Sequence, residues 1–502
     1  MSVVAIALLI TLVTTAAFTL VGLASAGRRV NLDSYLVHRN QVGGWQALAT
    51  VVASSLGAWI LFSPPEAGSV FGGMSAILGY CLGSAGAVAL FCFVGPRLRH
   101  LMPRGHSLNE YVKHRYGGVM YWFVEGVMLL YMFVYLTAEL TAIAKALQLV
   151  ANVPLGVTAL VVITAVFAYT TYGGLKASIL TDSLQFIVIV PLLLVAFGLT
   201  LAALGGFASA FEPIRAATPE LLSLNNVGGL RFGATLMIAI VAAEIFNQGN
   251  WQRVYACRDS KVVRGAFLGS ALLILPLLLM AGLLGLMAVQ FDFASDTAFF
   301  ELLGALSMPG WVLMGVVILA LALVMSSLDT LLNGMASLFA LDLMAILPGH
   351  SAEQTLKASR ALTVLVGLPA IAIAAQGYSV LYLFFIADLI CAAVLFPVLS
   401  GLYSRYITAN NAFWSSLIGI GAGLLFFPKP DFTPLFPVPG AADLLHSFAA
   451  ALVVSTVVSC VWRLICRQSG TSAFSFSVLQ QREDALTSTQ SGSGTELFVR
   501  PD

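Results

Sequence analysis

Apolar segments of about 20 residues recur along almost the whole chain, and they restrict its fold more than any other feature. The hydrocarbon core of a bilayer is about 30 Å thick, so a helix needs about 20 apolar residues to cross it. Hydrophobic residues account for 59% of the 502 residues and charged residues for 9%, which is outside the range of soluble domains. The sequence therefore predicts an all-α integral membrane protein embedded in a lipid bilayer.

Thirteen segments are predicted to form transmembrane helices. The first has no basic residue before its apolar run and is as long as a membrane span, so we interpret it as a helix and not as a signal peptide. The predicted helices cover residues 3–25, 45–71, 73–96, 119–150, 154–172, 174–205, 228–252, 262–290, 308–346, 355–376, 379–403, 411–427 and 441–466.

The distribution of basic residues indicates the orientation of these helices. With the N-terminus outside, 20 of the 24 Lys and Arg residues fall in inward-facing loops or in the C-terminal tail. The positive-inside rule then predicts a plasma or inner membrane protein with its N-terminus outside and its C-terminus in the cytoplasm. The net charge of +1 gives no indication of a nucleic-acid partner, and the six Cys residues show no spacing typical of metal ligands.

The predicted helix 308–346 carries a stripe of polar side chains. Ser and Thr residues often serve close packing between membrane helices, but a carboxylate in the middle of a span costs about 2.5 to 3.5 kcal/mol. We therefore expect a polar or positive partner to face Asp329. At about 100° per residue, the polar side chains within a wedge of roughly 100° are Asp329, Ser326, Ser337, Thr330 and Asn333, with Ser327 just outside it.

The predicted helix 45–71 contains the segment "FSPPEAG", which predicts a break near its middle. Pro64 and Pro65 lack amide donors, and Pro64 disfavours helical backbone at Ser63. Unwound backbone inside a membrane is tolerated only where it lines a cavity or is buried in protein. The alternative is a simple proline kink.

A second break is predicted in the helix 228–252, where Glu244, Asn247, Gln248 and Gly249 interrupt the apolar run. Each broken helix leads a block of five helices, and such a layout is typical of inverted-repeat transporters. The predicted units are an extra N-terminal transmembrane helix (1–27), a first five-helix repeat (28–205), a second, inverted repeat (206–405), two C-terminal transmembrane helices (406–467) and a disordered cytoplasmic tail rich in Ser, Thr and Gly (468–502).

Four segments carry a resemblance to a known family: "LDSYLVHRNQVGGW", "SLNEYVKHRYG", "YTTYGGLKASILTDSLQ" and "VMSSLDTLLNGMASLFALDL". In this order, the chain resembles the sodium:solute symporter family over residues 28 to about 405. That family includes sodium-coupled sugar, proline, pantothenate, sialic acid and urea carriers with a LeuT-like core. The resemblance implies a core of two inverted five-helix repeats whose first and sixth helices are broken. It also implies a transporter without enzymatic activity or organic cofactor, with Na⁺ as the coupling ion.

The resemblance also implies where sodium binds, between the first and eighth core helices. Hydroxyls and unwound carbonyls suit a hard cation such as Na⁺. A second sodium would use Asp182 and Thr330, with Asp329 where a hydroxyl is usual, so Asp329 could strengthen that site, replace it or bind a proton. The implied ligands of the first site are the carbonyls of Ala53, Leu56 and Leu323 and the hydroxyls of Ser326 and Ser327.

Candidate substrate-pocket residues flank the two breaks. Glu66 has an alternative explanation as the favourable acid in the first turn of a half-helix that begins near Pro64. The proline carriers place aromatic residues before an "FGQP"-like turn, whereas here Val241 and Ile245 precede "FNQG", which disfavours proline as the solute. The candidates are Ser55, Trp59, Ser63 and Glu66 on the first core helix and Glu244, Asn247, Gln248 and Trp251 on the sixth.

The expected function is sodium-coupled import of a small polar solute, amino-acid-like or urea-like, by alternating access. The alternatives are a sodium:monocarboxylate symporter, a transporter-like sensor and a passive channel. The tail after residue 467 is too short for the output domain that a sensor normally carries, and a channel needs no sodium site. The oligomeric state is left open.

Overall fold

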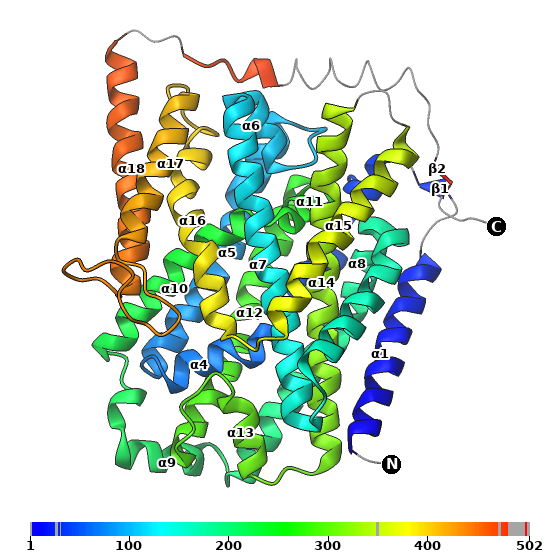
Figure 1. Ribbon diagram of the computed structural model, residues 1–502, viewed down its shortest axis with the longest axis vertical. Coiled ribbons are helices and arrows are strands. Elements are labelled where there is room, and N and C mark those ends of the chain that lie inside the picture. Colours follow the sequence, from blue (N-terminus) through cyan, green and yellow to red (C-terminus); the bar gives the residue numbers. More distant parts are fainter. Residues whose placement is uncertain are drawn as a thin grey trace.

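A computed structural model describes residues 3–25, 29–30, 32–347, 351–469, 473–479 and 497–498. Long helices run side by side along the long axis of the molecule, as Figure 1 shows. The described strands are the two-residue pair β1 (Arg29–Val30) and β2 (Leu497–Phe498), which are antiparallel. The described part of the chain is thus built almost entirely of helices.

The helices in chain order are α1 (Val3–Ser25), α2 (Leu32–Leu36), α3 (Gly44–Ser55), η1 (Ala58–Leu61), α4 (Ser63–Ser69), α5 (Met74–Leu101), α6 (Leu108–Tyr116), α7 (Gly118–Ala151), α8 (Leu155–Ala203), α9 (Phe207–Ala217), η2 (Pro219–Leu222), α10 (Val227–Ile245), α11 (Gln248–Ala256), α12 (Ser260–Ala288), η3 (Val289–Phe291), α13 (Ala298–Ala305), α14 (Gly310–Ile346), α15 (Ala352–Ala374), α16 (Val380–Ser400), α17 (Ala409–Leu424) and α18 (Leu444–Gln468).

Ten of the described helices are long and apolar enough to cross a membrane, and the bent pair formed by α3 and η1 with α4 adds an eleventh. The predicted number of thirteen spans is therefore not confirmed. Leu155–Thr170 is apolar but shorter than this length, and α17 has 16 residues, fewer than the roughly 20 that a full span needs. The chain is nevertheless a multi-pass membrane protein.

The first predicted break is present, but it begins earlier than the prolines suggested. α3 ends at Ser55, Leu56 is extended with φ −106° and ψ 109°, and the two halves of the helix are bent by 57°. Pro64 and Pro65 lie in the first turn of α4, where a missing amide donor costs nothing. Ser63, which the sequence placed outside the helix, is therefore the first residue of α4.

The second predicted break separates α10 from α11. α10 ends at Ile245, and the side chain of Asn247 accepts a hydrogen bond from the Gly249 N–H at 3.0 Å, which caps the start of α11. Gly249, the glycine beside Asn250, therefore lies within the second half of the broken helix and not in the break itself.

A single change of backbone direction divides α8 into the two spans predicted at 154–172 and 174–205. Gly174 has φ 57° and ψ −162°, whereas the rest of the element is helical. A side chain at this position would also overlap Tyr35, so a glycine suits both the conformation and the available space.

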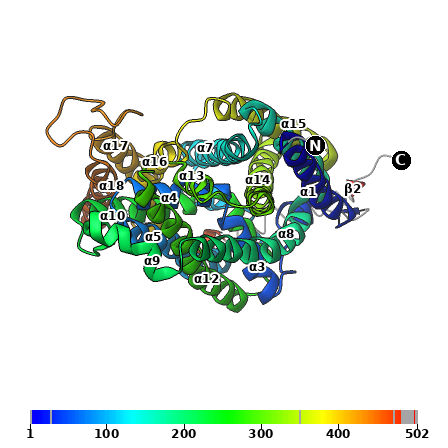
Figure 2. The ribbon, with the colours of Figure 1, turned by 90° about the horizontal axis from the view of Figure 1, so that it is seen from below.

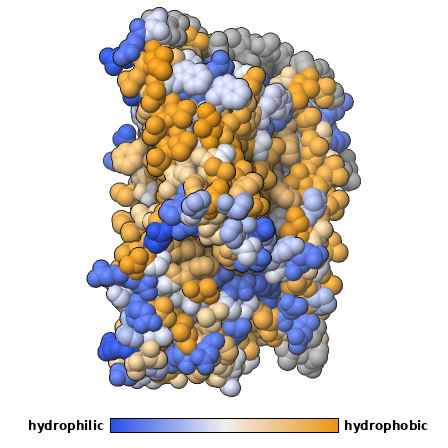
Figure 3. All heavy atoms as spheres, turned by 60° about the vertical axis from the view of Figure 1, so that its left-hand side comes forward, coloured by the Kyte–Doolittle hydropathy of each residue, from blue (hydrophilic) through white to orange (hydrophobic). Residues whose placement is uncertain are grey.

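The remaining helices flank the core on two opposite sides. Seen from below in Figure 2, α1 lies beside α8 and α14, and α17 and α18 lie on the far side. The exposed face of α18 carries large apolar side chains that suit contact with lipid, and apolar side chains dominate the upper part of this face in Figure 3. The exposed apolar side chains of α18 are Val453, Val457, Val461, Leu464 and Ile465.

Part of the tail that was expected to be disordered packs against the end of the helix bundle. The Phe474 N–H donates a hydrogen bond to the Arg405 carbonyl at 3.0 Å, and the Arg115 guanidinium lies 4.1 Å from the centre of the Phe474 ring. Leu479 is buried. Aromatic and apolar residues within this Ser-rich segment explain the contact, whereas residues 480–496 and 499–502 lie outside the described part of the chain.

Glycines bring several helix backbones into direct contact. A Cβ added at Gly79 on α5 would overlap the backbone of Gly233 on α10, and one at Gly285 on α12 would overlap the backbone of Pro65 on α4. Small residues allow this close approach between membrane helices. The contacts join α5 to α10, and α4 to α12, at the backbone.

We expect Gly79→Ala to destabilise the protein, because the added methyl group has no space between α5 and α10. Such overpacking typically costs about 1 to 3 kcal/mol. The matched control is Gly86→Ala on the same helix, where the nearest atom to the new Cβ would be 3.6 Å away, an ordinary contact. Thermal denaturation of the purified protein measures both variants. Equal melting temperatures for the two would contradict the proposed contact.

Candidate functional site

Asp329 lies in the middle of α14 and is completely buried. Its carboxylate accepts hydrogen bonds from the hydroxyls of Tyr169 at 3.1 Å, Ser178 at 2.8 Å and Thr181 at 3.1 Å, all of which belong to α8. The expected polar partner is therefore a set of hydroxyl donors, and these hydrogen bonds offset part of the cost of burial.

A second buried carboxylate, Asp182 on α8, joins several helices. It accepts hydrogen bonds from Thr50 of α3 at 2.5 Å and from Ser326 of α14 at 2.6 Å. It also forms an ion pair with Arg253 of α11, whose Nη2 atom lies 2.6 Å from Asp182 and 2.7 Å from the Thr330 hydroxyl. A guanidinium thus lies between the two residues expected to bind a second sodium.

Arg253 was not among the site residues identified from the sequence. It was assigned to an inward-facing loop because it follows the predicted helix 228–252, but it lies within α11 and is 1% exposed. A basic residue one position beyond a predicted span looks the same in the sequence whether it lies in a loop or forms a buried ion pair.

The residues implied for the first sodium site belong to two parts of the chain, the end of α3 with the residue that follows it, and α14. The Leu56 N–H donates to the Val52 carbonyl at 3.1 Å, and the carbonyls that follow, from Ala53 onward, lie beyond the regular helical donors. Ala53, Leu56 and Leu323 are fully buried. On α14 the Ser327 hydroxyl donates to the Leu323 carbonyl at 3.2 Å.

Glu139 of α7 lies against this break and was missed by the sequence analysis. It is fully buried, and its Oε2 atom accepts a hydrogen bond from the Ala58 N–H at 2.8 Å. Its Oε1 atom is buried without a hydrogen-bond partner, and the Ser327 side chain is close enough to interact with the carboxylate. A Cβ at Gly57 would overlap Oε1, so a glycine is required for this approach. Glu139 is one of two acids within the predicted helix 119–150, and this was an available signal.

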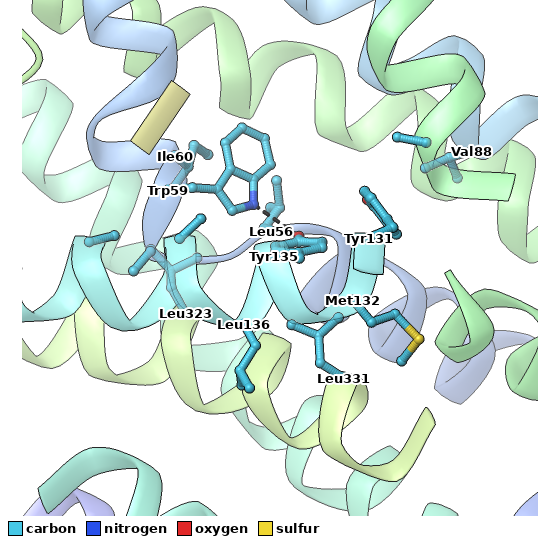
Figure 4. Close-up of a cluster of buried hydrophobic side chains, with 14 of the residues drawn as sticks. Leu56, Trp59, Ile60, Val88, Tyr131, Met132, Tyr135, Leu136, Leu323 and Leu331 are labelled. Carbon is cyan, nitrogen blue, oxygen red and sulfur yellow. Dashed lines mark hydrogen bonds between the residues drawn. The ribbon is translucent and has the colours of Figure 1, made fainter. Parts of the chain in front are cut away.

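A small cavity lies beside the two breaks. Aromatic side chains form much of its wall, and the Trp59 indole N–H donates to the Tyr135 hydroxyl at 3.0 Å, as Figure 4 shows. The Trp59 ring also stacks on Tyr80 with 5.6 Å between the ring centres. The cavity is lined by Trp59, Tyr80, Tyr131, Tyr135, Leu236, Ile240, Ala243, Glu244, Leu381, Phe384, Phe385 and Asp388.

Two of the eight candidate pocket residues, Trp59 and Glu244, line this cavity. The Glu244 carboxylate accepts hydrogen bonds from Tyr131 at 2.9 Å, from Asn250 at 2.7 Å and from Asn247 at 3.3 Å. Asn247 therefore supports the cavity through Glu244 without lining it.

The other candidates have partners elsewhere. Glu66 accepts a hydrogen bond from Ser379 at 3.3 Å, Gln248 donates to the His106 carbonyl at 2.9 Å, and Trp251 donates to the Ile245 carbonyl at 2.7 Å. The remaining candidates outside the cavity lining are Ser55 and Ser63.

Most cavity residues missed by the sequence analysis come from α5, α7 and α16. Asp388 is the exception. It is the only charged residue in the predicted helix 379–403, so the argument made for Asp329 from the cost of a buried carboxylate applies to it as well. Asp388 is 4% exposed. Tyr80 and Tyr131 carried no such signal, since aromatic residues in apolar helices usually serve packing.

A cluster of charged side chains surrounds His106 at the end of the bundle where α2 and α6 lie. The His106 ring nitrogens lie 3.0 Å from Asp33 and 3.2 Å from Glu110, and Asp33 also pairs with Arg39 at 2.5 Å. Burial lowers the pKa of His106, but the nearby charge and hydrogen bonds of Glu110 and Asp33 outweigh it and raise the pKa to about 9. Against the effect of burial, hydrogen bonds from His106 and Arg39 lower the pKa of Asp33.

Two broken helices, a polar network between them and a cavity beside them are the features of a secondary transporter. The chain matches the sodium:solute symporter family over residues 35–419, which is well over half of its length, and it belongs to that family. The family and the fold support sodium-coupled symport as its activity and Na⁺ as its coupling ion. The protein is a transporter and not an enzyme.

Known proteins similar to this chain are transporters of several solutes. The chain is 26% identical to the spermidine transporter DUR31 of Candida albicans, over 75% of this chain and 71% of that protein. It is 24% identical to the human sodium/myo-inositol cotransporter 2, over 86% of this chain and 71% of that protein. The solved structure of a Na⁺-coupled sialic acid symporter resembles it with a TM-score of 0.74, 18% identity and coverage of 92% of this chain and 97% of that one.

The His106 cluster leads to a pH-dependent prediction. Because the folded-state pKa of about 9 exceeds the ordinary value of 6.5, the proton on His106 stabilises the folded protein fully below pH 6.5, and this contribution is lost as the pH rises through 9. We expect His106→Gln to lower the free energy of unfolding by about 1 to 3 kcal/mol at low pH and much less above pH 9.

The measurement is thermal denaturation across this pH range, with His446→Gln as the control because that imidazole is half exposed. A difference between wild type and His106→Gln that does not change with pH would contradict the assignment.

Proposed function

We propose that the protein imports a small polar solute bearing an amino or amide group, amino-acid-like or urea-like, together with sodium by alternating access. We infer a plasma or inner membrane location with the N-terminus outside and the C-terminus in the cytoplasm. The observation that carries the proposal is the end of α3, where helical hydrogen bonding stops after Leu56 and the Glu139 carboxylate accepts from the Ala58 N–H and lies close to Ser327 of α14.

Sodium at this position would use the carbonyls of Ala53, Leu56 and Leu323 and the hydroxyls of Ser326 and Ser327. Oxygen ligands of this kind suit Na⁺, and the carboxyl group of the buried Glu139 lies nearby. The ion would join α3 to α14 and thereby hold the wall of the cavity in place. Its release would loosen both helices, so binding of solute and ion would be coupled without covalent chemistry.

A single sodium ion is sufficient for concentrative uptake of a neutral solute. A positive charge that moves down 100 mV gains about 2.3 kcal/mol. A tenfold sodium gradient adds about 1.4 kcal/mol. Together they could concentrate the solute a few hundredfold.

The cavity favours an amino or amide group over the alternative of a monocarboxylate. Glu244 and Asp388 both line it, and a carboxylate solute would meet two like charges. One relative is a spermidine transporter, which supports an amino group on the solute, whereas another carries myo-inositol. A passive channel or a transporter-like sensor would not require the sodium ligands at the end of α3.

We further infer that Arg253 takes the place of a second sodium. Its guanidinium lies 2.6 Å from Asp182 and 2.7 Å from the Thr330 hydroxyl, so the negative charge of Asp182 already has a cationic partner. Asp329 has hydroxyl donors of its own. These contacts favour one sodium per transport cycle.

The first prediction of this proposal concerns the two serines. We expect Ser326→Ala and Ser327→Ala to raise the sodium concentration that gives half-maximal stabilisation or uptake by about tenfold, the usual effect of losing a hydroxyl that binds a charged group. Sodium is varied against potassium at constant ionic strength, in a thermal-shift assay and in proteoliposomes screened with small solutes.

The matched control for the serine variants is Ser416→Ala, because that buried hydroxyl donates to the Ala412 carbonyl within its own helix at 2.8 Å. Unchanged sodium dependence in both Ser326→Ala and Ser327→Ala would reject the site. Uptake that is equal in sodium and potassium gradients would reject symport itself.

The second prediction concerns Arg253. We expect a Hill coefficient for sodium close to one in the wild type, and a loss of about 3 to 5 kcal/mol of stability in Arg253→Gln, since Asp182 would then be buried without its cationic partner. The double variant Arg253→Gln with Asp182→Asn should recover much of that stability. A wild-type Hill coefficient near two would show that a second sodium binds despite Arg253.

A further inference from the structure

The charges around the cavity are all of one sign. Glu244 and Asp388 line it, and no Lys, Arg or His does so among the described residues. The two carboxylates are close enough to repel each other. In a site from which water is largely excluded, this repulsion is relieved by a cation or by protonation. The cavity therefore presents two acidic side chains, and no basic one, to a solute.

The two carboxylates differ in their hydrogen bonds. Glu244 is held by Tyr131 on one oxygen and by Asn250 and Asn247 on the other, so its orientation is fixed. Asp388 Oδ1, by contrast, is buried and has no hydrogen-bond partner among the described residues. A buried acceptor without a donor is costly, so Asp388 is the group that a donor on the solute would satisfy.

The rest of the wall suits a positive charge attached to an apolar chain. The ring centres of Tyr135 and Phe384 are 5.1 Å apart, and those of Trp59 and Phe384 are 6.2 Å apart. Aromatic faces attract ammonium and guanidinium groups and also pack against methylene groups. The cavity thus offers aromatic faces, apolar contacts and acceptors for N–H donors.

The same wall offers little to a neutral polyol or to an anion. The Trp59 N–H already donates a hydrogen bond to Tyr135, and the Tyr131 hydroxyl already donates one to Glu244. A solute with many hydroxyls would leave most of them unpaired against aromatic rings, and an anion would find no basic side chain.

We propose that this cavity selects organic cations, namely primary amines or guanidinium compounds, whose positive group is bound by Asp388 and Glu244. The proposal rests on the transport function proposed above and names its substrate class. It assigns to Asp388 the role of a direct ligand of the solute cation and to Glu244 that of a fixed second carboxylate. The aromatic residues enclose the apolar part of the solute.

The test compares four solutes of similar length on the purified wild-type protein: putrescine, butylamine, butanediol and butyrate. Binding is measured by thermal shift and calorimetry, and uptake of labelled putrescine is measured in proteoliposomes with sodium or potassium outside. We expect putrescine and butylamine to bind and butanediol and butyrate to bind at least about tenfold more weakly.

Asp388→Asn and Glu244→Gln should each weaken putrescine binding by about tenfold or more while sodium still stabilises the protein. The control is Glu125→Gln, which alters a buried carboxylate on α7 that contacts Asn109 and does not line the cavity. This control should change putrescine binding by less than about twofold. If Asp388→Asn does not fold, the wild-type solute series and Glu244→Gln still decide the matter.

The outcomes separate this proposal from the proposed function. Sodium-dependent uptake of butanediol or butyrate at least as strong as that of putrescine would overturn the cation proposal and leave symport intact. Putrescine binding that is lost in Asp388→Asn but does not drive sodium-dependent uptake would support the cation site and reject symport. A folded wild type that binds sodium but no amine would overturn the cation proposal.

Discussion

The centre of this molecule depends on the need for each polar group inside a membrane to have a polar partner. At the break between α3 and α4 the backbone loses its helical hydrogen bonds, and Glu139 supplies the acceptor for the Ala58 N–H. In the middle of α3, Thr50 donates to Asp182, which also accepts hydrogen bonds from Ser326 and Arg253. The broken helices are stable because neighbouring helices provide these partners.

Much of the fold could be predicted from hydropathy, because the cost of exposing polar backbone to lipid makes long apolar segments helical. The two broken helices could also be predicted, since prolines and polar residues interrupt otherwise apolar runs. The exact residue at which a helix breaks could not be predicted. α4 begins at Ser63, and the chain unwinds at Leu56 because a tertiary contact between Glu139 and Ala58 stabilises the unwound backbone there.

The candidate site was predictable only where a residue was anomalous within its own helix. Asp329 and Glu244 stood out as acids in apolar surroundings, and Asp388 could have been found in the same way. Tyr131 and Tyr135 could not, since an aromatic residue that lines a cavity and one that fills a core look the same in a sequence. Arg253 was missed because its role depends on Asp182, 71 residues earlier in the chain.

The glycine contacts between α4, α5, α10 and α12 have a mechanical consequence. Where backbones touch, as at Gly79 and Gly285, there are no side-chain rotamers that could absorb a sliding movement, and separation would open voids. Helices α5 and α10 must therefore move together, and so must α4 and α12. Rearrangement is left to the contacts with α7 and α16, whose side chains help to line the cavity. A substitution inside either rigid pair would weaken every conformation alike, whereas one at these outer contacts would alter the balance between conformations.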